Sequence, residues 1–152
     1  MTDTTAVAAE RPPVSIITGY LGSGKTTLLN SLLRDPGMAR AAVIINEFGE
    51  VALDHLLVAT PSENTVLLAN GCLCCTIRGD LVGTLAGLLA QRGAGGVPAF
   101  DRVLVETTGL ADPVPVLRTL ASDPAIAPLM RPGAVITMVD AVNGARQLHD
   151  CT

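Results

Sequence analysis

Five short apolar runs of strand length recur along the chain. They lie at residues 14–18, 42–46, 65–69, 102–105 and 134–139, and each is continuous rather than alternating with polar residues. A continuous apolar run is typical of a strand buried on both faces, as in a parallel sheet. The pattern therefore predicts five buried strands.

Leucines at helical spacing separate several of these runs. They form one stripe within residues 26–34 and another within residues 78–92. A third helix is predicted over residues 113–121, where Asp112 would cap the helix and Pro113 would take its first position. Strands that alternate with helices predict an α/β fold, with a mostly parallel sheet flanked by helices.

Residues 1–12 show no such periodicity. They are small and polar and end in a proline pair that begins at Pro12. We expect a disordered tail over residues 1–12 and a folded domain over residues 13–152.

Composition narrows the class of protein. The chain has 152 residues, of which 49% are hydrophobic, and a formal net charge of −4 with only three aromatic residues. This composition fits one soluble domain and argues against a nucleic-acid partner, which would need a basic surface or a stacking platform. The chain has no apolar run of about 20 residues and no apolar N-terminal core, so we expect neither a membrane span nor a secretion signal, and a cytoplasmic protein.

The clearest motif is GYLGSGKT at residues 19–26, which fits the phosphate-loop pattern G-x-x-x-x-G-K-[ST] between a strand and a helix. Glycines allow backbone N–H groups to turn toward phosphates, and the helix N-terminus adds partial positive charge. Lys25 is the only lysine of the chain and would reach the β- and γ-phosphates. Thr26 would bind Mg²⁺, and Thr27 could contact the α-phosphate. The nucleotide-binding residues predicted are Gly19, Gly22, Ser23, Gly24, Lys25, Thr26 and Thr27.

An acid at the end of another strand would complete a magnesium nucleotide site. Glu106 follows the run at 102–105 and could hold Mg²⁺ through water or orient the attacking water, which makes it a candidate catalytic residue beside Lys25. Gly109 could bring a backbone N–H to the γ-phosphate. Asp140 is either a helix cap for the segment that begins at Ala141 or an acid behind the magnesium site.

Three of the four cysteines, Cys72, Cys74 and Cys75, fall within four positions directly after a predicted strand. They are too close together to join distant parts of a fold by disulfides. A thiolate cluster favours zinc or Cu(I), with cobalt as an alternative, and Glu50 or His55 could complete the site. The alternative is a redox pair or small buried residues.

Four segments each follow a predicted strand: the phosphate loop, residues 46–50, the cysteine segment and the segment at Glu106. In a parallel sheet they would therefore collect at the carboxyl ends of the strands, where such folds bind ligands. We therefore hypothesise that residues 46–51 and 72–76 act as switch segments. Triphosphate and Mg²⁺ would assemble the metal site, and hydrolysis would release the ion.

Taken together, the motifs resemble those of the CobW-type metal-chaperone GTPases, which are relatives of the urease and hydrogenase maturation GTPases. The resemblance covers the phosphate loop, NEFGE at 46–50, GCLCC at 71–75, ETTGLADP at 106–113 and VDAV at 139–142. It implies a P-loop NTPase fold, GTP hydrolysis with Mg²⁺, and handling of zinc or cobalt. It also implies a client metalloprotein or a cobalamin-synthesis enzyme as partner, and it leaves a homodimer open.

The chain departs from this family in one respect. The family reads guanine with a later [NT]-K-x-D segment, and no such segment exists in this chain because Lys25 is its only lysine. The chain therefore resembles the N-terminal part of a GTPase domain, without the guanine-recognition segment and the C-terminal domain. Two further readings stay open, namely an ATP-using P-loop protein with incidental cysteines and a catalytically idle metal- or phosphate-binding module.

Overall fold

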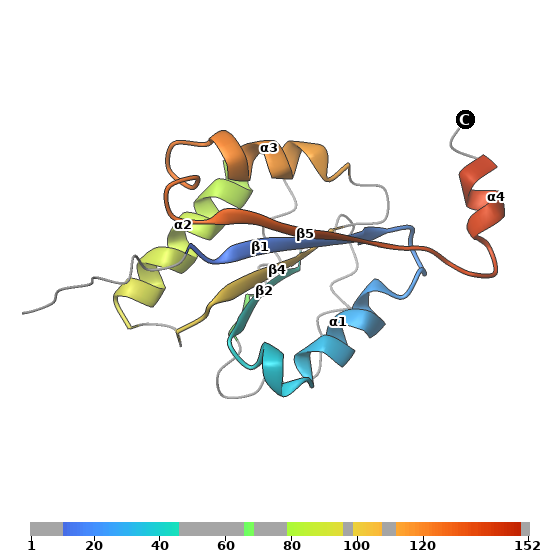
Figure 1. Ribbon diagram of the computed structural model, residues 1–152, viewed down its shortest axis with the longest axis horizontal. Helices are drawn as coiled ribbons and strands as arrows, with labels where there is room; N and C mark the ends of the chain where they lie inside the picture. The colour runs from blue at the N-terminus through green and yellow to red at the C-terminus, as the bar shows by residue number, and fades with distance from the viewer. Residues whose placement is uncertain (1–10, 46–65, 69–78, 96–98, 108–111, 150–152) are drawn as a thin grey trace, which may run out of the picture.

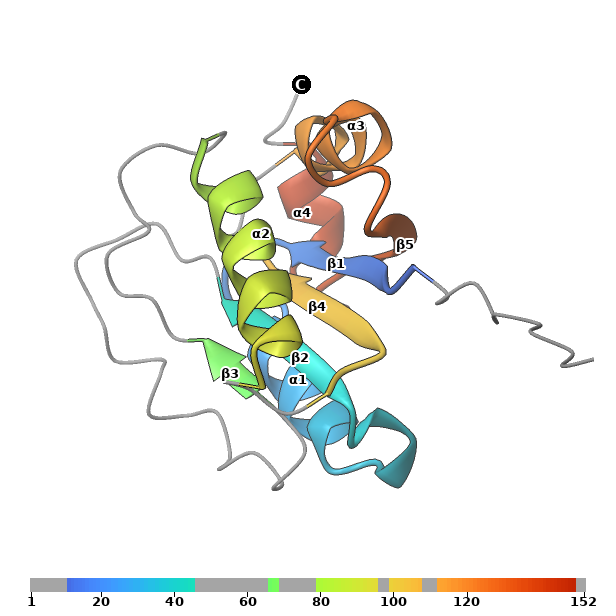
Figure 2. The same ribbon diagram turned by 90° about the vertical axis from the view of Figure 1, so that its left-hand side faces the viewer.

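The computed structural model describes residues 11–45, 66–68, 79–95, 99–107 and 112–149. These residues form three layers, in which one sheet is covered by helices on both faces (Figures 1 and 2). The sheet has five strands in the order β3-β2-β4-β1-β5, and every described pairing is parallel. The strands are β1 (Pro13–Gly19), β2 (Ala41–Ile45), β3 (Val66–Leu68), β4 (Arg102–Glu106) and β5 (Arg131–Met138). The predicted α/β class with a mostly parallel sheet is confirmed.

Alternate residues of the inner strands supply two separate cores. On one face, Leu104 packs with Leu29 of helix α1 (Lys25–Leu33). On the other face, Val103 and Val105 pack with residues of α2 (Gly79–Gly93) and α3 (Val114–Ser122). Because successive side chains of a strand point to opposite faces, a strand covered on both faces must be apolar throughout. This explains why the inner strands read as continuous apolar runs.

The strand β5 differs from the prediction, which described all five runs as buried on both faces. It lies at the edge of the sheet, beside β1 only, and Val135 in its middle is 40% exposed. It also begins three residues early, at Arg131, and so includes Pro132. Proline is tolerated there because one side of an edge strand makes no ladder hydrogen bonds.

The helices lie within a few residues of their predicted bounds, and two short elements complete the described part: the 3-10 turn η1 (Pro36–Met38) and helix α4 (Gly144–His149). Arg11 and Pro12, which the sequence assigned to the tail, are hydrogen-bonded. The Arg11 guanidinium donates to the Ala127 carbonyl at 2.7 Å, and the Pro12 carbonyl accepts from the Arg131 N–H at 3.2 Å. Residues 1–10 lie outside the described residues. Among the described helices, none combines the length and the apolar character that a membrane span requires.

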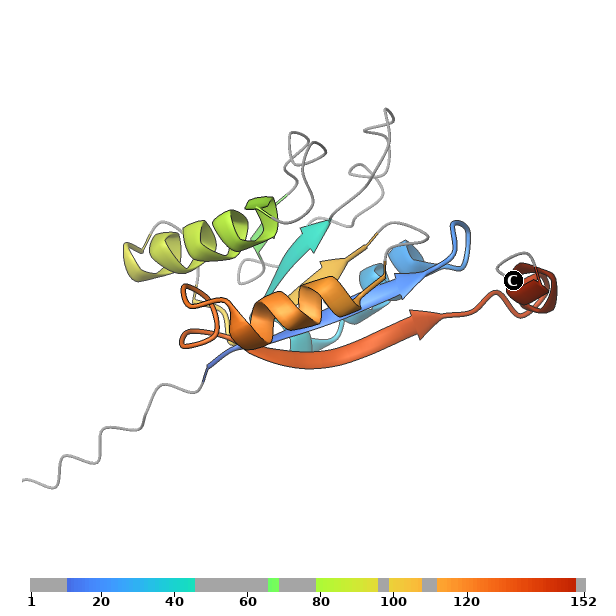
Figure 3. The ribbon, with the colours of Figure 1, turned by 90° about the horizontal axis from the view of Figure 1, so that it is seen from above.

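Because every strand runs in the same direction, all carboxyl ends meet at one edge of the sheet. The segment after β1 leads into α1 at this edge, and the chain after β5 continues beyond it to α4 (Figure 3). The fold thus brings the carboxyl ends of β1, β2, β3 and β4 to one end of the molecule.

Candidate phosphate-binding site

Buried polar side chains are gathered at one place in the described part of the chain. They are Thr18, Lys25, Glu106 and Thr107, and they lie at the carboxyl ends of the adjacent strands β1 and β4 or at the start of α1. Lys25 and Glu106 are 8% and 7% exposed, and they are the only buried charged residues among those described. Burying a charge is costly unless it is paired or hydrogen-bonded. Opposite charges concentrated in this way indicate a functional site.

The loop that joins β1 to α1 contains three glycines with positive φ angles. Gly19, Gly22 and Gly24 have φ values of 140°, 79° and 93°, in the region that side chains disfavour. Gly19 is also crowded, because a Cβ there would overlap the Met138 carbonyl oxygen and lie 2.9 Å from the Ser23 hydroxyl. Gly24 precedes the first residue of α1, so the N-terminus of the helix opens directly onto this loop.

The Lys25 ammonium folds back over the loop. Its Nζ donates to the Gly19 carbonyl oxygen at 2.8 Å and to the Tyr20 carbonyl oxygen at 2.9 Å. These neutral acceptors satisfy a buried cation without neutralising its charge. The ammonium is therefore held near the N-terminus of α1, where a bound anion would compete with the two carbonyls for its hydrogen bonds.

Thr26 and Glu106 contact each other at the carboxyl end of β4, beside the start of α1. The Thr26 hydroxyl donates to Glu106 Oε1 at 3.0 Å, although 80 residues separate the two in sequence. The register sets this contact, because Glu106 pairs with Ile17 at the end of β1, and the N–H of Thr107 donates to the Ile17 carbonyl at 2.9 Å. A hydroxyl and a carboxylate are hard oxygen donors of the kind that Mg²⁺ prefers. The two residues fit a magnesium site.

The remaining predicted residues of this site fall into two groups. Ser23 lies within the loop and Thr27 is exposed on the first turn of α1. Gly109 lies outside the described residues. The site residues remain predictions, but the structure places the described ones around one loop.

Asp140 acts as a cap. Its Oδ1 accepts from the N–H groups of Val142 at 2.8 Å and Asn143 at 3.0 Å, and its Oδ2 accepts from Asn143 Nδ2 at 2.9 Å. The Asn143 side chain and backbone, and then the Val142 N–H, hold the pKa of the Asp140 carboxyl below its usual value. Of the two interpretations left open by the sequence, the cap is the one these contacts favour. The helix itself begins later than expected, at Gly144 rather than Ala141.

The proposed metal ligands Glu50, Cys72, Cys74 and Cys75, and the alternative His55, lie outside the described residues. Within the described ranges, no group of three or more His, Cys, Asp or Glu side chains could hold a metal ion. The strand β3, which precedes these cysteines in the sequence, pairs with β2 and is the edge strand on the opposite side of the sheet from β5.

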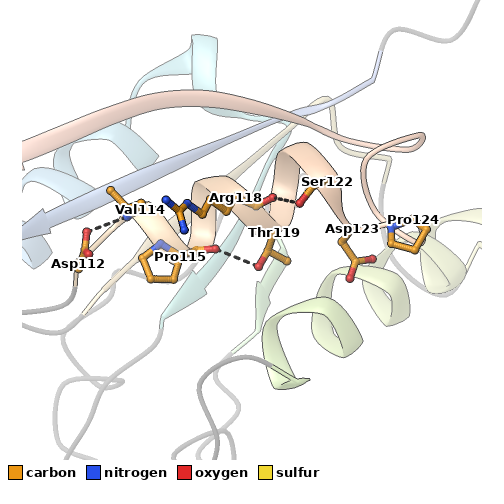
Figure 4. A pocket seen from close by; sticks show the side chains of 8 residues that line it. All are labelled: Asp112, Val114, Pro115, Arg118, Thr119, Ser122, Asp123 and Pro124. Atoms are coloured by element: carbon orange, nitrogen blue, oxygen red, sulfur yellow. Dashed lines mark hydrogen bonds between the residues drawn. The ribbon is translucent and has the colours of Figure 1, made fainter.

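A pocket of about 670 Å³ lies along α3 (Figure 4). Most of its polar groups serve the helix: Asp112 accepts from the Val114 N–H at 2.9 Å, while the Thr119 and Ser122 hydroxyls donate to carbonyls four residues earlier. The sequence predicts Asp112 as the cap and Pro113 as the first helical residue; in the structure Pro113 is the N-cap, α3 begins at Val114, and Asp112 lies one residue before the cap. Because most of its polar groups are hydrogen-bonded to the backbone of α3, this pocket is a weaker candidate for a ligand-binding site than the phosphate loop.

Two contacts at the phosphate loop were not anticipated from the sequence. The Tyr20 hydroxyl donates to the Gln147 carbonyl oxygen of α4 at 3.0 Å, and Thr107 is buried and donates to the Ile17 carbonyl at 3.3 Å. Tyr20 is the only tyrosine of the chain, a signal that could have drawn attention to it. Its partner could not be inferred, because 127 residues separate the two.

A parallel sheet, a glycine loop between β1 and α1, and an acid at the end of the adjacent β4 define a P-loop NTPase fold. The family model of the CobW/HypB/UreG nucleotide-binding domain matches residues 13–150. The chain belongs to this family, as the sequence motifs suggested.

Relatives and solved structures agree with this assignment. The chain is 39% identical over 139 residues to the zinc chaperone YjiA of Escherichia coli strain K12, covering 91% of this chain and 43% of that protein. It is 36% identical over 144 residues to the zinc-regulated GTPase metalloprotein activator 1 of Schizosaccharomyces pombe, covering 91% and 34%. The crystal structure of the Zn(II)-bound YjiA GTPase from E. coli matches with a TM-score of 0.68 and 32% identity, covering 92% and 44%. The chain thus spans less than half the length of each.

We predict opposite effects for two serines of β1 and the loop. Ser23 Oγ is buried with no hydrogen-bond partner among the described residues, whereas Ser15 Oγ accepts from the Ala134 N–H at 3.2 Å. Ser23→Ala should stabilise the fold by about 1 kcal/mol, because an unsatisfied buried hydroxyl is removed. Ser15→Ala should destabilise it by about 1 kcal/mol, because a bonded acceptor is lost. Urea unfolding of both variants tests this pair, and equal signs would contradict it.

Proposed function

We propose that this chain is the nucleotide-binding part of a GTP-hydrolysing metallochaperone. In this proposal it binds GTP with Mg²⁺ at the phosphate loop and zinc or cobalt at the C-x-C-C segment. The state of the nucleotide then governs transfer of the metal. The observation that carries the proposal is the burial of Lys25 and Glu106 together at the carboxyl ends of two adjacent strands.

The phosphates would bind where Lys25 now contacts two carbonyls. A phosphate oxygen carries negative charge and forms stronger hydrogen bonds with an ammonium than a neutral carbonyl does. The loop N–H groups and the N-terminus of α1 favour the same anion. Lys25 would therefore leave the Gly19 and Tyr20 carbonyls for the β- and γ-phosphates.

Thr26 and Glu106 would hold the magnesium ion, Thr26 through its hydroxyl and Glu106 directly or through a water molecule. When bound, Mg²⁺ neutralises charge on the phosphates during transfer. Glu106 would also orient the attacking water; the 3.0 Å hydrogen bond from the Thr26 hydroxyl to its Oε1 supports this role, because it holds the carboxylate at the start of α1. Catalysis by this site would be mostly electrostatic.

The metal would be cargo rather than a resident cofactor. Thiolates of Cys72, Cys74 and Cys75 suit zinc or cobalt, and Glu50 would add an oxygen ligand. The E. coli and S. pombe relatives are named a zinc chaperone and a zinc-regulated GTPase metalloprotein activator, which favours zinc. A client metalloprotein is the corresponding partner; a cobalamin-synthesis enzyme is the alternative.

The strand order supports communication between the two sites. The strand β3, which precedes the cysteines, is separated from β1 by β2 and β4. Three strand spacings amount to about 14 Å. The ends of β2 and β4, which lead to residues 46–50 and to Glu106, lie between them, so the signal would pass through those two segments.

The same proposal includes the organisation of the whole protein. It treats residues 13–152 as the N-terminal part of a GTPase domain, and it shortens the tail to residues 1–10 because Arg11 and Pro12 are hydrogen-bonded to that part. The protein would act in the cytoplasm, and a homodimer is the oligomer to test. An ATP-using protein or an idle binding module remain the competing functions.

The nucleotide claim is tested by calorimetry of GTP and ATP with Mg²⁺. We expect GTP to bind more tightly than ATP. Lys25→Ala should weaken binding by at least about tenfold, because a charge-assisted hydrogen bond is lost. Arg34→Ala, which removes one exposed cation just beyond α1, is the matched control and should bind normally. Tighter binding of ATP would favour the ATP-using alternative, and binding without phosphate release would favour the idle module.

The metal claim is tested by titrating Zn²⁺ in the presence of GTP and then of GDP. Cys74→Ser should lose zinc binding and keep nucleotide binding, because the thiolate is a ligand only of the metal. The two nucleotides should give different zinc affinities, since coupled sites must influence each other. Equal affinities would refute the coupling, and unchanged zinc binding in Cys74→Ser would refute the metal site.

A further inference from the structure

Tyr20 connects the phosphate loop to helix α4. Its backbone carbonyl accepts from Lys25 Nζ at 2.9 Å, and its hydroxyl donates to the Gln147 carbonyl oxygen at 3.0 Å. The same residue therefore contacts the ammonium that would bind phosphate and a helix that lies beyond the sheet.

Helix α4 stands apart from the five-stranded sheet in the described part of the chain. It projects past the carboxyl end of β5, next to the loop that follows β1 (Figures 1 and 3). It makes no extensive contact with another described helix or strand, and Leu148 is 70% exposed. The side-chain bonds of Asp140 hold the preceding turn together, and its carbonyl oxygen accepts from the N–H of Gly144 at the start of α4. The Tyr20–Gln147 hydrogen bond therefore joins α4 to the phosphate loop.

We propose that Tyr20 is a positioning residue that transmits occupation of the phosphate loop to α4. The inference rests on the proposed nucleotide site. When phosphates draw Lys25 away from the Tyr20 carbonyl, the loop N–H groups converge on the anion and fix the backbone at residue 20. The hydroxyl then holds Gln147 more persistently, and α4 opens less often.

Hydrogen exchange by NMR tests this at two amides, the Gly144 N–H that donates to the Asp140 carbonyl and the Gln147 N–H that donates to the Asn143 carbonyl. Without ligand, Tyr20→Phe should speed exchange of both amides by about fivefold, the factor expected for one intramolecular hydrogen bond. Saturating Mg²⁺ and GDP should slow exchange by about twofold or more in the unaltered chain and leave Tyr20→Phe unchanged. GDP affinity, measured by calorimetry on the same samples, sets the saturating GDP concentration for each chain, so that a change in affinity is not mistaken for a loss of transmission.

Asn143→Ala is the matched control. It removes the side-chain bond to Asp140, so it should speed exchange in α4 but retain the response to GDP. Equal exchange in the ligand-free unaltered chain and Tyr20→Phe would overturn the tether. Bound GDP with no change at Gly144 and Gln147, or the same change in Tyr20→Phe, would overturn the transmission and leave the proposed function intact. Absence of GDP binding would overturn both.

Discussion

The structure depends on keeping an ammonium and a carboxylate out of water at the end of a parallel sheet. Lys25 and Glu106 come from opposite halves of the chain, yet β1 and β4 are neighbours and bring them to the same edge. Isolated charges could not be buried there at tolerable cost. The protein satisfies the ammonium with two loop carbonyls and gives the carboxylate the Thr26 hydroxyl. Phosphate and Mg²⁺ would replace these contacts with stronger ones.

This arrangement explains the shape of the loop. Lys25 can reach the Gly19 and Tyr20 carbonyls only because the loop curls back toward the start of α1, and its positive φ values allow that curl. The crowding of Gly19 against Met138 ties the same loop to β5. The loop is therefore attached to both neighbours of β1 in the sheet, to β4 through the Thr26–Glu106 bond and to β5 through Gly19. An anion bound at the loop would therefore affect the ends of β1, β4 and β5 together.

Much of the fold could be predicted from the sequence, because continuous apolar runs and leucine stripes report burial directly. The phosphate loop was likewise evident, since its glycines and Lys25 have a fixed spacing. The edge position of β5 could not be predicted: its run is as apolar as that of β1, and only strand order decides that Val135 is 40% exposed. Contacts across long separations, such as Tyr20 with Gln147, depend on that same order. The cysteine segment remains a prediction from its residue types.

Lys25 also provides the most direct measurement. It is the only lysine, so an amine-reactive label can modify its Nζ and the N-terminal amine but no other lysine. The rate of labelling at Lys25, compared with that of the N-terminal amine in the same sample, should fall when Mg²⁺ and GTP are added, because phosphate oxygens occupy the ammonium. A rate at Lys25 that GTP leaves unchanged, relative to the N-terminal amine, would contradict the account.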